Sequence, residues 1–210
     1  FLKETKVPVV VIGQHTNLAN CIYHDDYGAG KAMGQAVAGF SKKGIAYIGV
    51  TRDDKAAGAA REDGFIAGLK NAGITLLEEN KRTSAFTLES GYEAALDLLE
   101  SKCDIDVISC ATDTIAAGAI EAIQTYLKKQ VPANAADAGA RMRYILENTS
   151  IRVTGFGDNQ MLKAVTGGIP TIHFGYKTSG IRGTELLLDS IERGEQIPIE
   201  MKLGFHLVGT

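Results

Sequence analysis

The segment "DVISCATDTIAAGAIEAIQTYL" (residues 106–127) joins a short apolar run to a longer stretch in which Ala, Ile and Leu recur at three- and four-residue spacing. The apolar run shows almost no polar alternation, which is typical of a parallel strand covered on both faces. Thr112 and Asp113 stand where the helical spacing begins, as residues at a helix start do. The segment therefore predicts one strand–helix unit of an α/β fold.

The same alternation of strand and helix recurs along the 210 residues. The apolar runs predict strands at 7–13, 45–50, 106–111, 151–156 and 170–174. The stretches of helical spacing predict helices at 27–43, 58–72, 88–101, 113–130 and 176–194. Strands that alternate with helices predict the α/β class, with parallel, doubly wound sheets.

Two stretches do not fit a simple succession of strand–helix units. The run "VPVVVIG" (7–13) lacks a polar face, so we expect a central strand whose neighbours lie in preceding sequence. The chain also begins at Phe1 without a methionine, which predicts a fragment that lacks about three leading strand–helix units. The stretch 131–150 is too long for a usual helix–strand connection and predicts an inserted helical turn or a mobile flap.

Composition excludes several classes of function. The net charge is −3, and the 22 Lys and Arg are scattered among 25 acids without a basic stripe, so this segment has no nucleic-acid or anionic-membrane surface. Cys21, Cys103 and Cys110 are odd in number and lack a CxxC spacing, which predicts reduced thiols in a cytoplasmic protein. No apolar run reaches the roughly 18 residues of a membrane helix, and no signal peptide is visible.

Polar and aromatic residues follow the predicted strands, at the edge where ligands bind in parallel sheets. They comprise Gly13-Gln14-His15, Arg52-Asp53-Asp54, Thr112-Asp113, Gly157-Asp158-Asn159 and Phe174-Gly175-Tyr176. The set is mixed in charge and flanked by aromatic rings. It favours a hydrogen-bonding cleft for an uncharged polyol over a phosphate site or a hydrolytic centre.

Three other kinds of site are disfavoured. The segment "GAGKA" (28–32) lacks the earlier glycine and the final hydroxyl of a phosphate-binding loop, so no nucleotide cofactor is expected. No metal is expected either. The candidate ligands match no zinc or calcium spacing, and the two acids among them suit the start of the helix at 27–43. These candidates are His15, Cys21, His24, Asp25 and Asp26. Ser90 and Ser109 lie outside any GxSxG motif, which argues against a serine nucleophile.

Four candidate residues allow a structural or a functional interpretation. Asp113 either caps the helix that begins there or also faces the ligand. Arg61 forms a surface ion pair beside Glu62-Asp63, or its planar guanidinium donates hydrogen bonds to a ligand's hydroxyl groups. Phe86 is a loop anchor or a platform for a sugar ring, and Asp158 is a ligand, a cap, a metal ligand or a catalyst. The pattern of residues leaves these alternatives open.

Taken in order, the motifs resemble those of bacterial LacI/GalR transcriptional regulators over nearly all of the chain. The resemblance lies in "VPVVVIG", "HDDYGAGKAM", "IAYIGV", "AAREDGFIAGL", "ESGYEAALDLL", "CATDTIAAGAI", "VTGFGDN" and "TIHFGYKTSGIRGTELLL". Within the family, "GFGDN" and "TIHFGYKTSGI" are most similar to the branch that regulates sucrose and related sugar operons.

The resemblance implies a type I periplasmic-binding-protein fold, in which two α/β lobes are joined by three crossovers and the N-lobe is incomplete here. Residues 1–42 and 173–196 would form part of the N-lobe, and residues 43–172 and 197–210 the C-lobe. The family's DNA-binding helix-turn-helix, through which a homodimer reads an operator, is not in this sequence.

The family's effector positions correspond to Arg61, Phe86, Asp113, Thr112, Asp158 and Tyr176, with Lys55 at the place of a second cation in some members. Gln14 follows Gly13, which replaces the acid that often ends that strand. Other departures are "GFGDN" for GFDN or GYDD, "SK" for the usual GH, and the insertion at 133–150 in a normally short link. They affect the identity of the effector more than the fold.

The function implied is that of a cytoplasmic repressor whose small-molecule effector, a sugar or sugar phosphate, changes operator binding without catalysis, cofactor or membrane contact. The alternative from the same fold is a periplasmic sugar-binding protein of a transporter. An α/β enzyme of flavodoxin-like or sugar-kinase type would need a phosphate loop that the sequence lacks.

Overall fold

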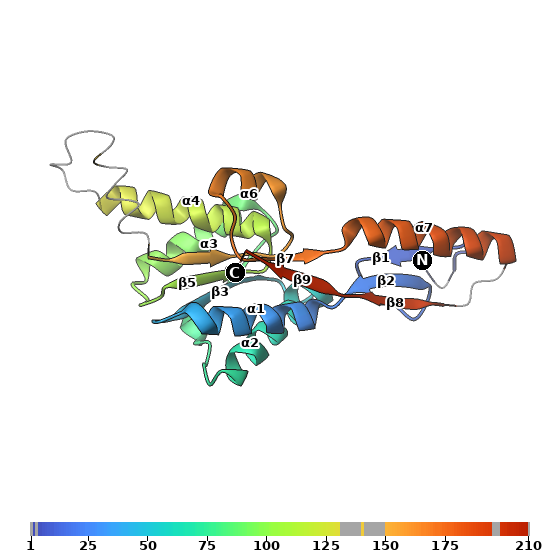
Figure 1. Ribbon diagram of the computed structural model, residues 1–210, viewed down its shortest axis with the longest axis horizontal. Helices are drawn as coiled ribbons and strands as arrows, with labels where there is room; N and C mark the ends of the chain where they lie inside the picture. Colours follow the sequence, from blue (N-terminus) through green and yellow to red (C-terminus); the bar gives the residue numbers. More distant parts are fainter. Residues whose placement is uncertain (1, 3, 131–139, 141–149, 195–197, 210) are drawn as a thin grey trace.

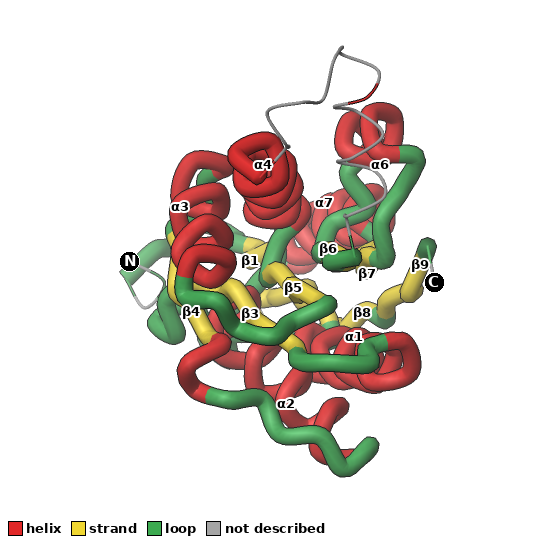
Figure 2. The backbone as a smooth tube through the Cα atoms, turned by 90° about the vertical axis from the view of Figure 1, so that its left-hand side faces the viewer, coloured by secondary structure: helices red, strands yellow, loops and turns green. Residues whose placement is uncertain are grey.

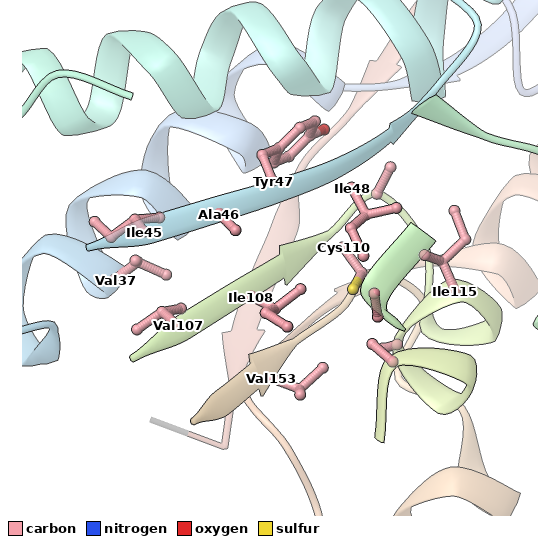
Figure 3. Close-up of a cluster of buried hydrophobic side chains, with 14 of the residues drawn as sticks. Val37, Ile45, Ala46, Tyr47, Ile48, Val107, Ile108, Cys110, Ile115 and Val153 are labelled. Atoms are coloured by element: carbon pink, nitrogen blue, oxygen red, sulfur yellow. The ribbon is translucent and has the colours of Figure 1, made fainter. Parts of the chain in front are cut away.

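Residues 106–127 form the predicted strand–helix unit, as β5 (Val107–Cys110) and α4 (Asp113–Gln130). The computed structural model describes residues 2, 4–130, 140, 150–194 and 198–209, so the insertion predicted at 131–150 lies almost entirely outside the described residues. All four residues of β5 are buried. Their side chains pack with Val37 of α1 (Asp26–Phe40), Ile115 of α4 and the neighbouring strands (Figure 3). The apolar run is therefore covered on both faces, as expected.

The larger sheet is parallel over most of its width. Four strands lie in the order β4 (Lys81–Ser84), β3 (Ile45–Val50), β5 and β6 (Arg152–Thr154). Beyond β6, the amides of Gly155 and Gly157 donate to the carbonyl oxygens of Pro170 (2.9 Å) and Ile172 (2.8 Å). This places β7 (Thr171–Phe174) beside the end of β6, and β9 (Phe205–Val208) pairs antiparallel with β7. The sheet thus continues through β7 and β9.

Helices cover both faces of this sheet. Figure 2 shows β3, β4 and β5 between two helix pairs, α1 with α2 (Arg61–Asn71) and α3 (Leu88–Glu100) with α4. The remaining helical elements are η1, a π-helix (Lys55–Ala60) that runs directly into α2, η2, a 3₁₀ turn (Glu78–Asn80), and α6 (Gln160–Thr166). These elements and the larger sheet make up the larger lobe, which confirms the doubly wound α/β class.

The smaller lobe consists of three parallel strands and one helix. The strand order is β1 (Val10–Ile12), β2 (Asn20–His24) and β8 (Glu200–Leu203), and α7 (Tyr176–Arg193) packs on β1 and β2. Among the described residues β1 pairs only with β2, and Ile12 is 52% exposed. The strand predicted to be central is therefore an edge of the described sheet.

The chain passes between the two lobes three times, each time through one residue. Asp25 joins β2 to α1, Gly175 joins β7 to α7, and Gly204 joins β8 to β9. Asp25 (φ −79°, ψ 67°) and Gly175 (φ −75°, ψ 60°) share the conformation of an inverse γ-turn, which is common where strands end. Figure 1 shows the smaller lobe, marked by α7 and β8, at one end of the long axis.

These crossovers bring the carboxyl ends of both sheets to the joint. Strand β2 ends at Asp25, where the chain enters the larger lobe, and β7 ends at Gly175, where it enters the smaller one. Strands β1 and β8 run parallel to β2, and β3 to β6 run in the direction of β7. The residues that follow the strands of one sheet therefore face those of the other.

The crossovers correct the boundaries predicted for the lobes. Helix α1 was assigned with residues 1–42 to the N-lobe, yet Met33 and Val37 belong to the core around β3. Strand β8 was assigned with 197–210 to the C-lobe, but it pairs with β2 in the smaller sheet. The boundaries at 42/43, 172/173 and 196/197 thus move to the crossover residues Asp25, Gly175 and Gly204. Each predicted boundary came from matching motifs to the family, whereas the chain changes lobe where a strand ends.

Glycines set how closely α1 and α2 approach. A Cβ atom on Gly34 of α1 would collide with the carbonyl oxygen of Phe65, and one on Gly68 of α2 with that of Lys31. Because backbone atoms cannot move aside as a side-chain tip can, both positions require glycine. Gly39, near the end of α1, has open space around it and provides a matched comparison.

We expect Gly34→Ala to lower the free energy of unfolding by about 1–3 kcal/mol, because the added methyl group forces the two helices apart. Gly39→Ala should raise it by roughly 0.5–1 kcal/mol, through the better helix propensity of alanine. Urea denaturation followed by circular dichroism measures both. Equal effects of the two substitutions would show that the close helix approach does not limit stability.

Candidate functional site

Arg61 occupies the centre of the joint between the lobes. It begins α2, and its Nε donates to Oδ1 of Asp26 at 2.8 Å, while Nη1 donates to the carbonyl oxygen of Ala111 at 2.7 Å. The guanidinium carbon lies 5.0 Å from the ring centre of Phe156 and 5.4 Å from that of Phe174. Arg61 therefore connects the start of α1 with the carboxyl ends of β5, β6 and β7.

The ion pair of Arg61 is not a surface pair with Glu62-Asp63, which was one of the two interpretations left open by the sequence. Those two acids pair with Arg52 instead, with Nη1 3.2 Å from Oε2 of Glu62 and Nη2 3.0 Å from Oδ1 of Asp63. The side chains of Arg61 and Asp26 are 13% and 7% exposed. A guanidinium in this position has further N–H groups that can donate to a ligand, and its two hydrogen bonds restrict its rotation.

Asp26 is a residue that sequence reasoning missed as part of the site. Its neighbour Asp25 is the helix cap, since Oδ1 of Asp25 accepts from the amide of Gly28 at 3.2 Å and pairs with Nζ of Lys202 at 2.7 Å. Asp26 was expected to serve the helix start as well, but its carboxylate faces Arg61. Its only sequence signal was the second acid of "HDD", which a helix start explains equally well.

His24 ties the first crossover to the second. Its ring stacks on Phe174 with centroids 4.7 Å apart, and Nε2 lies 3.0 Å from the hydroxyl oxygen of Ser179. Because that hydroxyl donates to the carbonyl oxygen of Gly175 at 3.0 Å, it accepts from His24, and Nε2 is the donor. Burial lowers the pKa of His24, Asp26 opposes this change, and Arg61 adds to it.

Thr112, not Asp113, caps α4. The hydroxyl of Thr112 accepts from the amide of Ile115 at 3.2 Å. The carboxylate of Asp113 is buried and reaches the other way, where Oδ1 accepts from the hydroxyl of Thr171 (2.7 Å) and Oδ2 from the amide of Asn159 (2.6 Å). Burial raises the pKa of Asp113, while these two hydrogen bonds oppose the rise. Asp113 thereby holds the loop that follows β6 against β7.

Asn159, not Asp158, caps α6. Its side-chain oxygen accepts from the amides of Met161 (2.9 Å) and Leu162 (3.0 Å). Asp158 has a positive φ of 50°, and its Oδ2 lies 3.0 Å from Nδ1 of His173. Gly157 before it has φ 138°, a conformation that side chains rarely adopt. The additional glycine of "GFGDN" thus lets the loop turn so that the acid faces β7.

Gln14 and Lys55 line a cavity of about 370 Å³ between the carboxyl ends of the smaller sheet and the start of η1. Oδ1 of Asp54 accepts from the amides of Ala56 (2.9 Å) and Ala57 (2.8 Å), which fixes where η1 begins and so where Lys55 stands. The full lining is Gly13, Gln14, His15, Tyr23, His24, Asp25, Asp26, Tyr27, Lys55, Ala56, Ala60 and Lys202.

The other predicted residues lie outside this cavity. Asp113 and Asp158 line a second cavity of about 180 Å³ beneath α6. Tyr176 is 53% exposed and meets His24 edge to face at 5.5 Å, which places it at the joint. Phe86 follows β4 and is 49% exposed. The structure thus brings Arg61, Tyr176, Gln14 and Lys55 to the joint and places Phe86 at the same edge of the larger sheet.

Neither a metal site nor a membrane-spanning helix is present in the described part of the chain. No three of its His, Cys, Asp and Glu residues are arranged to hold a metal ion. None of the helices within the described ranges is both long and apolar enough to cross a membrane.

Residues 2–166 match the periplasmic binding protein domain family, and the chain belongs to this family. The sucrose operon repressor of Staphylococcus xylosus is 28% identical over 208 residues, which cover 98% of this chain and 58% of the repressor. The chain thus spans a little over half the length of that relative.

Two solved regulators share the fold. A LacI-family transcriptional regulator of Enterococcus faecium, solved with bound ribose, has a TM-score of 0.75 at 18% identity and covers 96% of this chain and 69% of its own. The CelR–cellobiose complex, another transcriptional regulator, has a TM-score of 0.78 at 20% identity, over 95% and 57% of the two chains. With the match to the repressor, they confirm the predicted resemblance to LacI-family regulators.

The lowered pKa of the buried His24 ring predicts a pH dependence of stability. A lowered pKa in the folded state means that stability is complete above the ordinary histidine pKa near 6.5 and is lost as the pH falls below it. We expect the protein to lose more free energy of unfolding between about pH 7.5 and 5.5 than its His24→Phe variant, which keeps the stack on Phe174.

The control is His206→Phe, at an exposed position of β9, which should lose as much stability on acidification as the unaltered protein. Urea denaturation at both pH values measures the difference. An identical loss in all three proteins would contradict the account of His24.

Proposed function

We propose that the chain is the effector-binding core of a LacI/GalR-type transcriptional repressor. It binds a sugar or sugar phosphate between its two lobes and thereby changes operator binding by a dimer. The observation that carries the proposal is the position of Arg61, a nearly buried guanidinium held by Asp26 and Ala111 where all three crossovers meet. A ligand that contacts Arg61 there acts directly on the joint.

The relatives support a regulator over a transport protein. The curated relative that covers most of this chain is named a sucrose operon repressor, and the solved neighbours with ribose and cellobiose are both transcriptional regulators. The periplasmic sugar-binding protein of a transporter is therefore not favoured. A repressor acts in the cytoplasm, as the free cysteines also favour, and reads DNA through a helix-turn-helix domain.

The mechanism requires no chemical step. An effector shifts the equilibrium between two lobe arrangements only by its difference in affinity for them. Single-residue crossovers suit such a change, because a few backbone dihedrals absorb the rotation of one lobe against the other. We therefore propose a binding function without catalysis or cofactor.

The proposed effector contacts combine both lobes. Arg61 and Tyr176 lie at the joint, and Gln14 of the smaller lobe and Lys55 of the larger lobe line the cavity. Asp113 and Asp158 line the second cavity, Thr112 precedes Asp113 at the start of α4, and Phe86 offers an exposed ring at the edge of the larger sheet. We add Asp26, because the hydrogen bond to its carboxylate orients Arg61.

We expect Arg61→Ala to abolish sugar binding in isothermal titration calorimetry while the protein remains folded by circular dichroism. Because this change leaves the buried Asp26 without its cation, Arg61→Lys is the companion variant. Lysine keeps the positive charge but cannot hold Asp26, the Ala111 carbonyl and a ligand at once, so binding should also be lost. Arg182→Ala, at an exposed arginine of α7, should bind as the unaltered protein does.

Unchanged affinity in Arg61→Ala and Arg61→Lys would reject the proposed site. The ligands for this experiment are ribose, cellobiose, sucrose and their phosphate esters. Folding is checked first, so that loss of binding is not confused with loss of structure.

The dimer is proposed from an exposed apolar pair on α6. Met161 and Val165 are one helical turn apart and are each 75% exposed. Exposed apolar side chains that share a face are typical of protein interfaces. We propose that this face of α6 takes part in the homodimer.

We expect Met161→Asp to convert the dimer to a monomer, because the interface would have to bury an unpaired carboxylate. Size-exclusion chromatography with light scattering gives the molar mass. Leu77→Asp, at a residue 51% exposed elsewhere in the larger lobe, should remain dimeric. A Met161→Asp protein that stays dimeric would place the interface on another face.

A further inference from the structure

The charged side chains that line the cavity between Gln14 and Lys55 are not evenly paired. Its two carboxylates each have a cation of their own. Oδ1 of Asp25 lies 2.7 Å from Nζ of Lys202, and Oδ1 of Asp26 lies 2.8 Å from Nε of Arg61. Neither acid therefore has its charge left unmatched for a cationic ligand.

The cations of the cavity are matched too, with one exception. Nε2 of His15 lies 3.0 Å from Oε2 of Glu200, and Lys202 is matched by Asp25. Lys55 forms no ion pair with any residue that the structure describes, and Nζ of Lys55 contacts the carbonyl oxygen of Arg52 at 3.4 Å. The acid before it, Asp54, is occupied as the cap of η1. Lys55 is thus a lining cation that has no ion pair among the described residues.

The hydrogen bond of an ammonium group to an anionic oxygen is more favourable in free energy than its hydrogen bond to a neutral hydroxyl. A hydrogen bond that includes a charged group is worth about 1.5–3 kcal/mol, against roughly 1 kcal/mol for a neutral pair. Lysine binds phosphate as a point charge and needs no fixed geometry. Gln14, which follows β1 in the smaller lobe, and Tyr27 of α1 also line the cavity and supply neutral groups suited to hydroxyls. The cavity therefore offers a cation for an anionic group and neutral groups for hydroxyls.

We infer that the effector of the proposed function is an anionic sugar, whose phosphate or carboxylate lies against Lys55 and whose hydroxyl groups face Gln14. The inference rests on the proposed function and narrows its ligand class. It differs from the uncharged polyol that the residues after the strands favoured, because Asp25 and Asp26 pair with Lys202 and Arg61 and leave Lys55 without an ion pair.

The test is calorimetry on the protein with matched neutral and anionic ligands. The pairs are glucose with glucose 6-phosphate, fructose with fructose 6-phosphate, and sucrose with sucrose 6-phosphate, and glucuronate carries a carboxylate in place of the phosphate. We expect one phosphate ester or glucuronate to bind at least roughly tenfold more tightly than its neutral partner. Tighter binding of a phosphate ester identifies a phosphate as the anionic group of the effector, and tighter binding of glucuronate identifies a carboxylate.

Two variants assign the effect to this lysine. Lys55→Gln should remove the preference for the anionic partner, so that the two ligands of each pair bind with equal affinity. Lys70→Gln, at an exposed lysine of α2, should keep the preference and controls for the change in net charge.

The outcomes separate the two proposals. A neutral sugar that binds as tightly as its anionic partner, or a preference that survives in Lys55→Gln, overturns the inference and leaves the proposed function intact. No binding of any sugar or sugar acid in the panel overturns both. Inorganic phosphate that binds as tightly as the phosphate ester would also overturn it, because the hydroxyl groups would then contribute nothing.

Discussion

The ion pair between Arg61 and Asp26 is the contact on which the arrangement of the joint depends. It joins the first residue of α2 to the first residue of α1, directly after the chain enters the larger lobe. The same guanidinium holds the carbonyl oxygen of Ala111 and faces two aromatic rings, so it is fixed from four elements. A nearly buried charge that is so constrained resists reorientation, and a ligand that competes for its donors has to act on both helices.

The crossovers are also linked to one another. The amide of Asp25 donates to the carbonyl oxygen of Leu203 at 3.0 Å, which ties the first crossover to the third, and the stack of His24 on Phe174 ties the first to the second. These contacts link the three single-residue joints to one another. Within the larger lobe, glycines let the backbones of α1 and α2 approach closely.

The fold was largely predictable from the sequence, because buried parallel strands appear as unbroken apolar runs such as "IAYIGV" and "DVISC". The missed strands are β2 ("NCIYH"), β4 ("KRTS"), β8 ("EMKL") and β9 ("FHLV"). Each contains polar side chains, so none forms the unbroken apolar run of a buried parallel strand. Arg61 was found by its motif, but its partner was not, because Asp26 is 35 residues away and reads as a helix-start acid. Likewise only the backbone conformation distinguishes Asp158 from the true cap, Asn159.

The central claim is that a sugar bound at Arg61 changes the arrangement of the two lobes about their three crossovers. Its most direct test is the distance between nitroxide labels at Leu77 in the larger lobe and Ile191 on α7, measured by pulsed electron resonance in a Cys103→Ser background. We predict that the effector that binds in calorimetry shortens and narrows the distance distribution, and that Arg61→Lys abolishes this response. A distribution that the bound effector leaves unchanged would contradict the account.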